Sequence, residues 1–78
     1  ADKLRTIFRE SIVNVDYAQN IVVLKTMSGL ANAAAAALDS MRISYVVGSL
    51  AGDDTVLLIL RDAESARNFC DEIHEMLK

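Results

Sequence analysis

Several features that would define a functional class are missing from this 78-residue sequence. It has a single cysteine, so no disulfide can form within the chain, and a reducing cytoplasm is the expected compartment. No apolar run approaches the roughly 20 residues that a membrane-spanning helix needs, and no signal peptide is recognisable. A phosphate-binding glycine loop and a metal-type spacing of cysteine and histidine are also missing. The sequence therefore offers no standard motif for nucleotide, metal or membrane binding.

Positive charge is scarce and scattered. The formal net charge is −3, and the eight Lys and Arg residues form no run. Because affinity for nucleic-acid phosphates depends on clustered positive charge, this segment is not expected to bind nucleic acid by itself. The chain begins at Ala1 rather than Met, which indicates a fragment of a longer protein.

Apolar residues, in contrast, are abundant for so short a chain. They make up 53% of the sequence, and alanine contributes many of them. A domain of this size buries only about 60% of the surface that its unfolded chain exposes. We therefore expect part of the apolar surface to be covered by other copies of the same chain.

The residue pattern predicts the order strand–strand–helix, repeated twice. In the first unit, strands at 13–17 and 21–24 form a hairpin, and a helix capped by Ser28 covers 28–41. In the second unit, strands at 45–50 and 55–60 flank a turn at 51–54, and a helix capped by Asp62 continues to Leu77. Residues 4–10 fit either a lead-in turn of helix or an extension of the first strand.

Two hairpins joined through a helix make a four-stranded sheet, and the right-handed crossover rule places both helices on one face of it. We therefore predict an α+β fold, a two-layer ββαββα sandwich formed by a single domain. The other face of the sheet has no cover within the chain, although two of its strands are almost wholly apolar. We interpret this face as a surface for oligomerisation through the sheet or its margins.

The first predicted helix has two different faces. At 100° per residue, one stripe gathers the core residues Leu30, Ala34, Ala37, Leu38 and Met41. Asn32 and Asp39 lie seven residues apart on the opposite side, with Ala35 and Ala36 between them. Such a smooth face allows another backbone or a small ligand to approach closely. The alternative is that alanine simply favours helix formation.

Asp53 and Asp54 stand side by side just before an apolar strand, where adjacent like charges repel. They are either a solvated polar turn or a site for a cation. A guanidinium suits such a site best, because two carboxylates can share its planar fork of donors. Magnesium is the rival, but it would need more oxygen ligands than this region offers. Gly52 supplies a flexible backbone position beside the pair.

Catalytic chemistry has little support in the sequence. Cys70 falls on the apolar stripe of the last helix and is predicted to be core. His74 lies on the polar margin of the same helix without a nucleophile in register, so we predict a solvated surface residue. An enzyme is the weak hypothesis.

Three stretches together resemble the C-terminal domain of bacterial arginine repressors. They are the hairpin N-V-D-Y-A-Q-N-I-V-V-L-K-T, the helix S-G-L-A-N-A-A-A-A-A-L-D-S and the turn A-G-D-D-T, and the resemblance runs from about Ile7 to the end. It implies that residues 1–78 form one arginine-binding and oligomerisation domain, assembled as a hexamer of two stacked trimers with L-arginine between them. It also implies a cytoplasmic regulator of arginine metabolism, not an enzyme, with L-arginine as its co-repressor and no metal or other cofactor. Operator DNA would be bound through an N-terminal winged helix-turn-helix domain that is absent from this chain.

The resemblance also implies a set of ligand contacts. Asp53, Asp54, Asp39 and Asn32 match the positions of the contacting side chains, and the backbone around Ser49 and Ala51 should contribute. Two positions depart from the family: Ser28 stands where proline is frequent, and Asn32 replaces a longer glutamine. Two other classes of function remain open at this stage, a ligand-independent oligomerisation module and a small metal-dependent enzyme.

Overall fold

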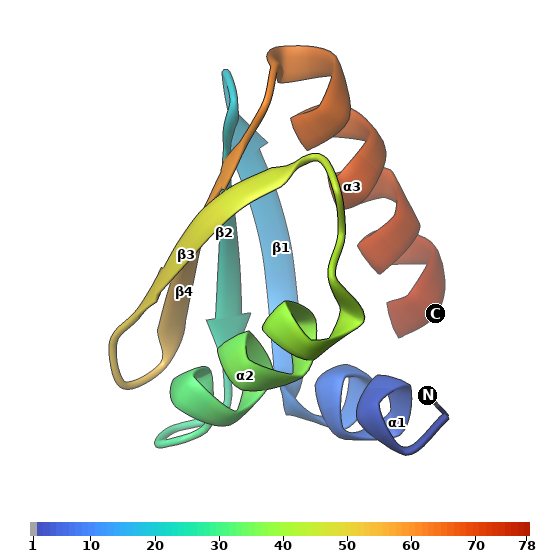
Figure 1. Cartoon of the computed structure of the whole chain (residues 1–78). Helices are drawn as coiled ribbons and strands as arrows, with labels where there is room; N and C mark the ends of the chain where they lie inside the picture. Colours follow the sequence, from blue (N-terminus) through green and yellow to red (C-terminus); the bar gives the residue numbers. More distant parts are fainter. Residues whose placement is uncertain (1) are drawn as a thin grey trace.

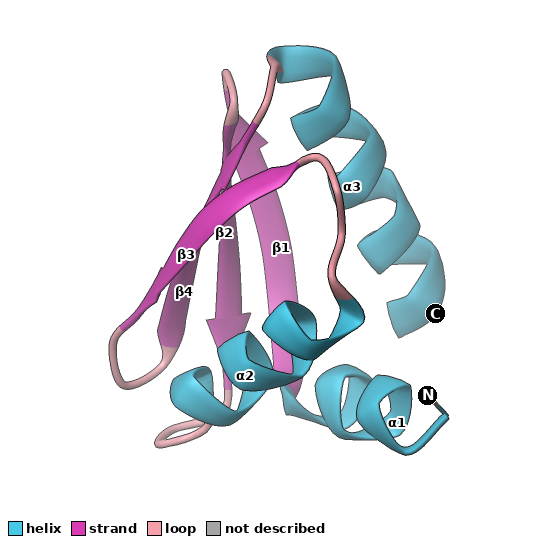
Figure 2. Cartoon of the chain, in the orientation of Figure 1, coloured by secondary structure: helices cyan, strands magenta, loops and turns pink. Residues whose placement is uncertain are grey.

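The computed structural model describes residues 2–78 as three helices and one four-stranded antiparallel sheet (Figure 1). The elements in chain order are α1 (Asp2–Ser11), β1 (Ile12–Ala18), β2 (Ile21–Thr26), α2 (Ala31–Met41), β3 (Val46–Ala51), β4 (Thr55–Leu60) and α3 (Ala63–Leu77). The strand order in the sheet is β1-β2-β4-β3. Helices α2 and α3 pack on the same face of the sheet, which confirms the predicted α+β sandwich (Figure 2).

Residues 4–10 belong to helix α1, so of the two alternatives left by the sequence, a helix or an extension of the first strand, the helix is confirmed. It packs mainly against α2 and brings Phe8 into the core, where only 1% of that residue is exposed. At its end the Ser11 hydroxyl donates a hydrogen bond of 2.7 Å to the carbonyl of Ile7, four residues back. The complete order of elements is therefore αββαββα, with α1 added in front of the predicted ββαββα.

The two helix caps differ in origin. Asp62 caps α3 as predicted, because its carboxylate accepts a 2.7 Å hydrogen bond from the backbone N–H of Ser65. That hydrogen bond lowers the pKa of the Asp62 carboxyl. The predicted cap of α2 by Ser28 is wrong, since α2 begins at Ala31 and Gly29, with φ +79°, turns the chain before it. The N–H of Ala31 instead donates to the carbonyl oxygen of Asp53, at 3.1 Å.

The core lies between the sheet and the helices. Its largest fully buried side chains come from one helix and the two central strands: Phe8, Val22, Leu24, Val56, Leu58 and Leu60. Ala34, Ala37 and Leu38 of α2 are buried as predicted, but Ala35 is only 8% exposed and was wrongly placed on the outer face of the helix. Small residues allow α2 to lie close to the sheet and to α1, and this leaves Ala35 within the packed layer.

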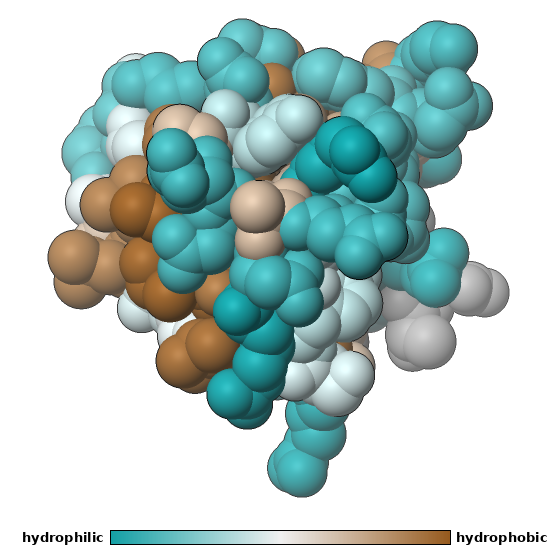
Figure 3. Space-filling model, turned by 90° about the horizontal axis from the view of Figure 1, so that it is seen from above, coloured by the Kyte–Doolittle hydropathy of each residue, from teal (hydrophilic) through white to brown (hydrophobic). Residues whose placement is uncertain are grey.

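The opposite face of the sheet, here called the outer face, is not covered by any element within residues 2–78. Cross-strand pairs on it include Ile21 with Ile59 and Leu50 with Leu57. Leu50 is 71% exposed, and the other three are 36–38% exposed. Figure 3 shows hydrophobic side chains gathered on the left side of that view of the molecule. The predicted uncovered apolar face is therefore present.

Candidate functional site

Asp53 joins the turn between β3 and β4 to the start of α2. Its carboxylate accepts a 3.2 Å hydrogen bond from the N–H of Gly29, while its carbonyl oxygen accepts from the N–H of Ala31. The first N–H groups of a helix have no partner inside it. Asp53 therefore supplies a hydrogen-bond acceptor at the start of α2, where Leu30 offers no capping side chain. One carboxylate oxygen of Asp53 is thereby committed to the backbone, and the turn and the helix start form one unit.

Asp54 is bonded to residues of the neighbouring strand β2 and to Thr55. Its carbonyl oxygen accepts a 2.8 Å hydrogen bond from the N–H of Thr26, and its Oδ1 accepts one of 2.9 Å from the Thr55 hydroxyl. The ammonium of Lys25 lies 3.9 Å from the same Oδ1, in an ion pair whose side chains are about half exposed. The adjacent carboxylates thus turn to different partners, which separates two charges that looked unfavourable in the sequence.

Asp39 and Ser49, two residues predicted separately as ligand contacts, lie next to each other in the structure. The hydroxyl of Ser49 in β3 donates to Asp39 Oδ1 in α2, over 3.4 Å. A small hollow of about 150 Å³ beside them is lined by Leu38, Asp39, Arg42, Ile43, Val46, Val47 and Gly48. Arg42 was not predicted as a site residue. It ends α2 in the left-handed conformation (φ 52°), with its N–H on the carbonyl of Asp39, and no local sequence pattern indicated that position.

The remaining predicted residues are placed more loosely. Ala51 is half-buried at the end of β3 and pairs with Val56. Directly after it comes the turn at 52–54, which holds Asp53 and Asp54 and is here called the acidic turn. Asn32 is exposed in the first turn of α2 and takes part in neither hydrogen-bonded group. The structure therefore gathers Asp53 with the start of α2, Asp54 with β2, and Asp39 with β3, and leaves Asn32 outside these contacts.

Glycine at position 29 is required by this arrangement. Gly29 has φ +79°, a conformation that costs an L-residue roughly 1–2 kcal/mol, although a Cβ there would meet no other atom within 4 Å. We expect Gly29→Ala to lower the free energy of unfolding by about 1 kcal/mol and to loosen the hydrogen bond to Asp53. Gly48→Ala is the matched control, because Gly48 also has open space but no positive φ. Urea unfolding of both variants measures the effect, and equal stability would contradict it.

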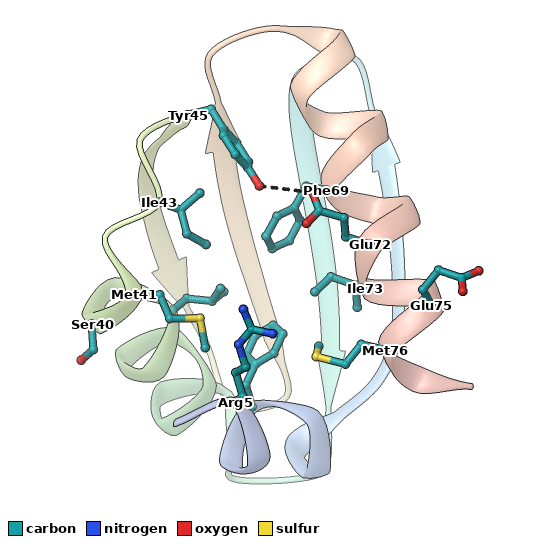
Figure 4. Close-up of a pocket in the computed structure, with 12 residues that line it drawn as sticks. Arg5, Ser40, Met41, Ile43, Tyr45, Phe69, Glu72, Ile73, Glu75 and Met76 are labelled. Carbon is teal, nitrogen blue, oxygen red and sulfur yellow. Dashed lines mark hydrogen bonds between the residues drawn. The ribbon is translucent and has the colours of Figure 1, made fainter. Parts of the chain in front are cut away.

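A larger hollow lies elsewhere (Figure 4). It measures about 900 Å³ between the three helices and the residues leading into β3, and none of the predicted ligand residues lines it. Tyr45 and Glu72 approach within 3.5 Å at its rim, and Arg5 projects into it. Burial, and secondarily Glu72, raises the pKa of Tyr45. This hollow thus lies between the helices, separate from Asp39, Asp53 and Asp54.

Cys70 and His74, the two α3 side chains weighed for catalysis, lie in different environments. Cys70 is buried in the core, as predicted, and burial raises the pKa of its thiol, with Asp16 and Asp71 adding to the shift. His74 is exposed, as predicted, and its Nε2 also lies 3.2 Å from the carbonyl oxygen of Val15. Within residues 2–78, no three His, Cys, Asp or Glu side chains are grouped so that they could hold a metal ion.

These features define a small α+β domain that combines an acidic turn braced against a helix with an uncovered apolar sheet face. Residues 8–75 match the family described as "Arginine repressor, C-terminal domain". The chain belongs to this family, so the fold and the residues that suggested the resemblance agree with the comparison.

Curated relatives support the same assignment. The chain is 48% identical over 77 residues to the arginine repressor of Acetivibrio thermocellus, covering 99% of this chain and 50% of that protein. It is 44% identical over 77 residues to the arginine repressors of Thermoanaerobacter sp. (strain X514) and Clostridium acetobutylicum, covering 99% of this chain and 51% of each relative. The chain thus spans about half the length of these relatives. Among the described residues, no helix has the length and apolar character needed to cross a membrane.

Proposed function

We propose that this domain binds L-arginine through Asp53, Asp54 and Asp39, with Asn32 and the chain around Ser49 and Ala51 completing the contacts. One observation carries the proposal. Each carboxylate of the acidic turn has one oxygen engaged in a fixed contact, Asp53 with Gly29 and Asp54 with Thr55, which leaves its second oxygen for a ligand. Side chains that are already oriented bind with less loss of freedom than mobile ones.

A guanidinium fits this arrangement better than other cations. Its planar fork can bond two carboxylates at once, whereas an ammonium is a compact point charge. Magnesium would require a set of oxygen ligands close together. The carboxylates of Asp53 and Asp54 contact different partners, and Asp39 pairs with Ser49 on other elements. These carboxylates do not form the compact set of oxygen ligands that magnesium needs. We therefore assign the acidic turn to the guanidinium and Asp39 to the amino-acid head.

Self-association is the second part of the proposal. The acidic turn is exposed at the surface of a single chain, and the apolar outer face is uncovered. A second copy of the chain would cover the apolar outer face and enclose the acidic turn. Ligand binding and assembly would therefore stabilise each other by linkage. The family resemblance implies that this assembly is a hexamer of two trimers with arginine between them. A ligand-independent oligomerisation module is the alternative.

In the longer protein, we infer, this domain senses arginine for a transcriptional regulator of arginine metabolism. Curated relatives carry the name arginine repressor and are about twice as long. The half that this chain does not span would bind operator DNA, consistent with the net charge of −3 here. The domain would act in the cytoplasm by binding rather than by catalysis, with L-arginine as co-repressor.

Calorimetric titration with L-arginine tests the proposal, with citrulline as a nearly isosteric neutral control. We expect saturable binding of arginine and at least roughly tenfold weaker binding of citrulline, because the urea group of citrulline is neutral and cannot form an ion pair with the carboxylates. Sedimentation velocity at low protein concentration should show a larger species with arginine than without it. Absence of arginine binding would refute the proposal, and binding without any change in assembly would remove the linkage.

A further inference from the structure

Lys25 lies where the outer face of the sheet meets the acidic turn. It pairs with Thr55 across β2 and β4, and its Nζ donates a 2.9 Å hydrogen bond to the Thr55 hydroxyl. That hydroxyl donates in turn to Asp54 Oδ1 over 2.9 Å, and the ammonium itself is 3.9 Å from the same oxygen. The ammonium is therefore held beside the carboxylate that we assign to the ligand.

The outer face offers Lys25 few other partners. The residues that pair across the strands on that face are Asn14, Asp16, Ala18, Ile21, Val23, Lys25, Gly48, Leu50, Thr55, Leu57 and Ile59. Among these described positions only Asp16 and Lys25 carry a charge, and Asp16 lies on the edge strand β1. An ammonium that loses water needs a paired anion. If copies of the chain cover this face, Asp54 is the carboxylate placed to neutralise Lys25.

We infer that Lys25 is a resident counter-cation for Asp54, with which the guanidinium of the ligand competes. This inference rests on the proposed function and adds a regulatory element to it. Without ligand, Lys25 offsets the negative charge of the acidic turn and so limits repulsion between carboxylates of neighbouring copies. With ligand, the positive charge of Lys25 opposes the arriving guanidinium. Lys25 therefore weakens arginine binding and makes assembly less dependent on arginine.

The expected size follows from Coulomb's law. Two like charges about 6 Å apart in bulk water repel enough to change an equilibrium constant by roughly threefold, and by roughly tenfold where the surrounding protein halves the effective dielectric constant. Salt screens exposed charges, so the effect should shrink as ionic strength rises. A residue that merely held the turn in place would have the opposite effect, because its loss would weaken binding.

The test compares Lys25→Gln with Lys78→Gln in calorimetric titrations with L-arginine at low and high salt. Glutamine keeps a polar side chain that can reach Thr55 but removes the charge, and Lys78 is an exposed lysine paired with Glu75 at 3.0 Å on α3. We expect Lys25→Gln to bind arginine three- to tenfold more tightly at low salt and Lys78→Gln to match the wild type. Lys25→Arg, which keeps the charge and adds a forked donor that can compete for Asp54, should bind arginine no more tightly than the wild type.

The outcomes separate the two proposals. If the wild type binds arginine and Lys25→Gln binds with unchanged or lower affinity, the role of Lys25 is refuted and the proposed function stands. Equal tightening in Lys78→Gln would also refute it, because the effect would then be one of net charge. If the wild type does not bind arginine, both proposals fail. Circular dichroism confirms that each variant is folded.

Discussion

Replacing Asp54 with asparagine should weaken L-arginine binding by about ten- to a hundredfold. The neutral amide cannot form an ion pair with the guanidinium and has only one accepting oxygen, whereas hydrogen bonds to charged groups contribute roughly 1.5–3 kcal/mol each. The fold should persist, because the tie from Asp54 to β2 runs through its backbone carbonyl and the N–H of Thr26. Calorimetric titration measures the affinity, and thermal unfolding checks the fold.

Asp71→Asn is the matched control for this experiment. Asp71 is an exposed carboxylate of α3, so the substitution changes net charge equally but leaves the acidic turn unaltered. Its arginine affinity should stay within about twofold of the wild type. If Asp54→Asn retained full affinity, the guanidinium would have to bind somewhere other than the acidic turn, and our assignment of the site would be wrong.

Placing a charge at the centre of the outer face should have the second large effect. Leu57 lies on a central strand with Val23 and Leu50 as its cross-strand neighbours. We expect Leu57→Glu to weaken self-association by at least roughly a hundredfold, because assembly would bury an unpaired carboxylate. The monomer should remain folded, since Leu57 faces away from the core. Sedimentation at several protein concentrations measures the change.

Ile7→Glu provides the comparison. Ile7 of α1 is 38% exposed and Leu57 is 37% exposed, so the two substitutions introduce the same charge at equally exposed apolar positions. Only Leu57 lies on the outer face. If both variants assembled like the wild type, the subunits would associate through a different surface, and the exposed strands would need another explanation.

Local patterns predicted most elements of the fold. Residues 55–60 form a strand with the predicted bounds, because a short apolar run bounded by the turn at 51–54 and by Asp62 is visible in the sequence itself. Asp62 caps α3 through a residue three positions away, so that prediction needed no distant information. Residues 4–10 stayed ambiguous, since a short amphipathic helix depends on tertiary packing for most of its stability.

Contacts between distant segments accounted for what the sequence did not reveal. Ser28 was the wrong cap because α2 begins three residues later, and the N–H of Ala31 at its start donates to the carbonyl of Asp53, over twenty residues further along the chain. The pairing of Lys25 with Asp54 depends on the register of β2 against β4, which no local pattern specifies. Site residues were therefore recognisable by type and resemblance, whereas their partners required the structure.

Asp53 belongs to the acidic turn and also accepts hydrogen bonds from Gly29 and Ala31 at the start of α2, and this double role has a kinetic consequence. A turn that is already pinned to a helix need not rearrange before a ligand enters, so encounter should be rapid and similar for all small cationic amino acids. Differences among such ligands should then appear in how long each one stays bound. Stopped-flow measurements would show ligand-specific dissociation rates on top of a nearly common association rate.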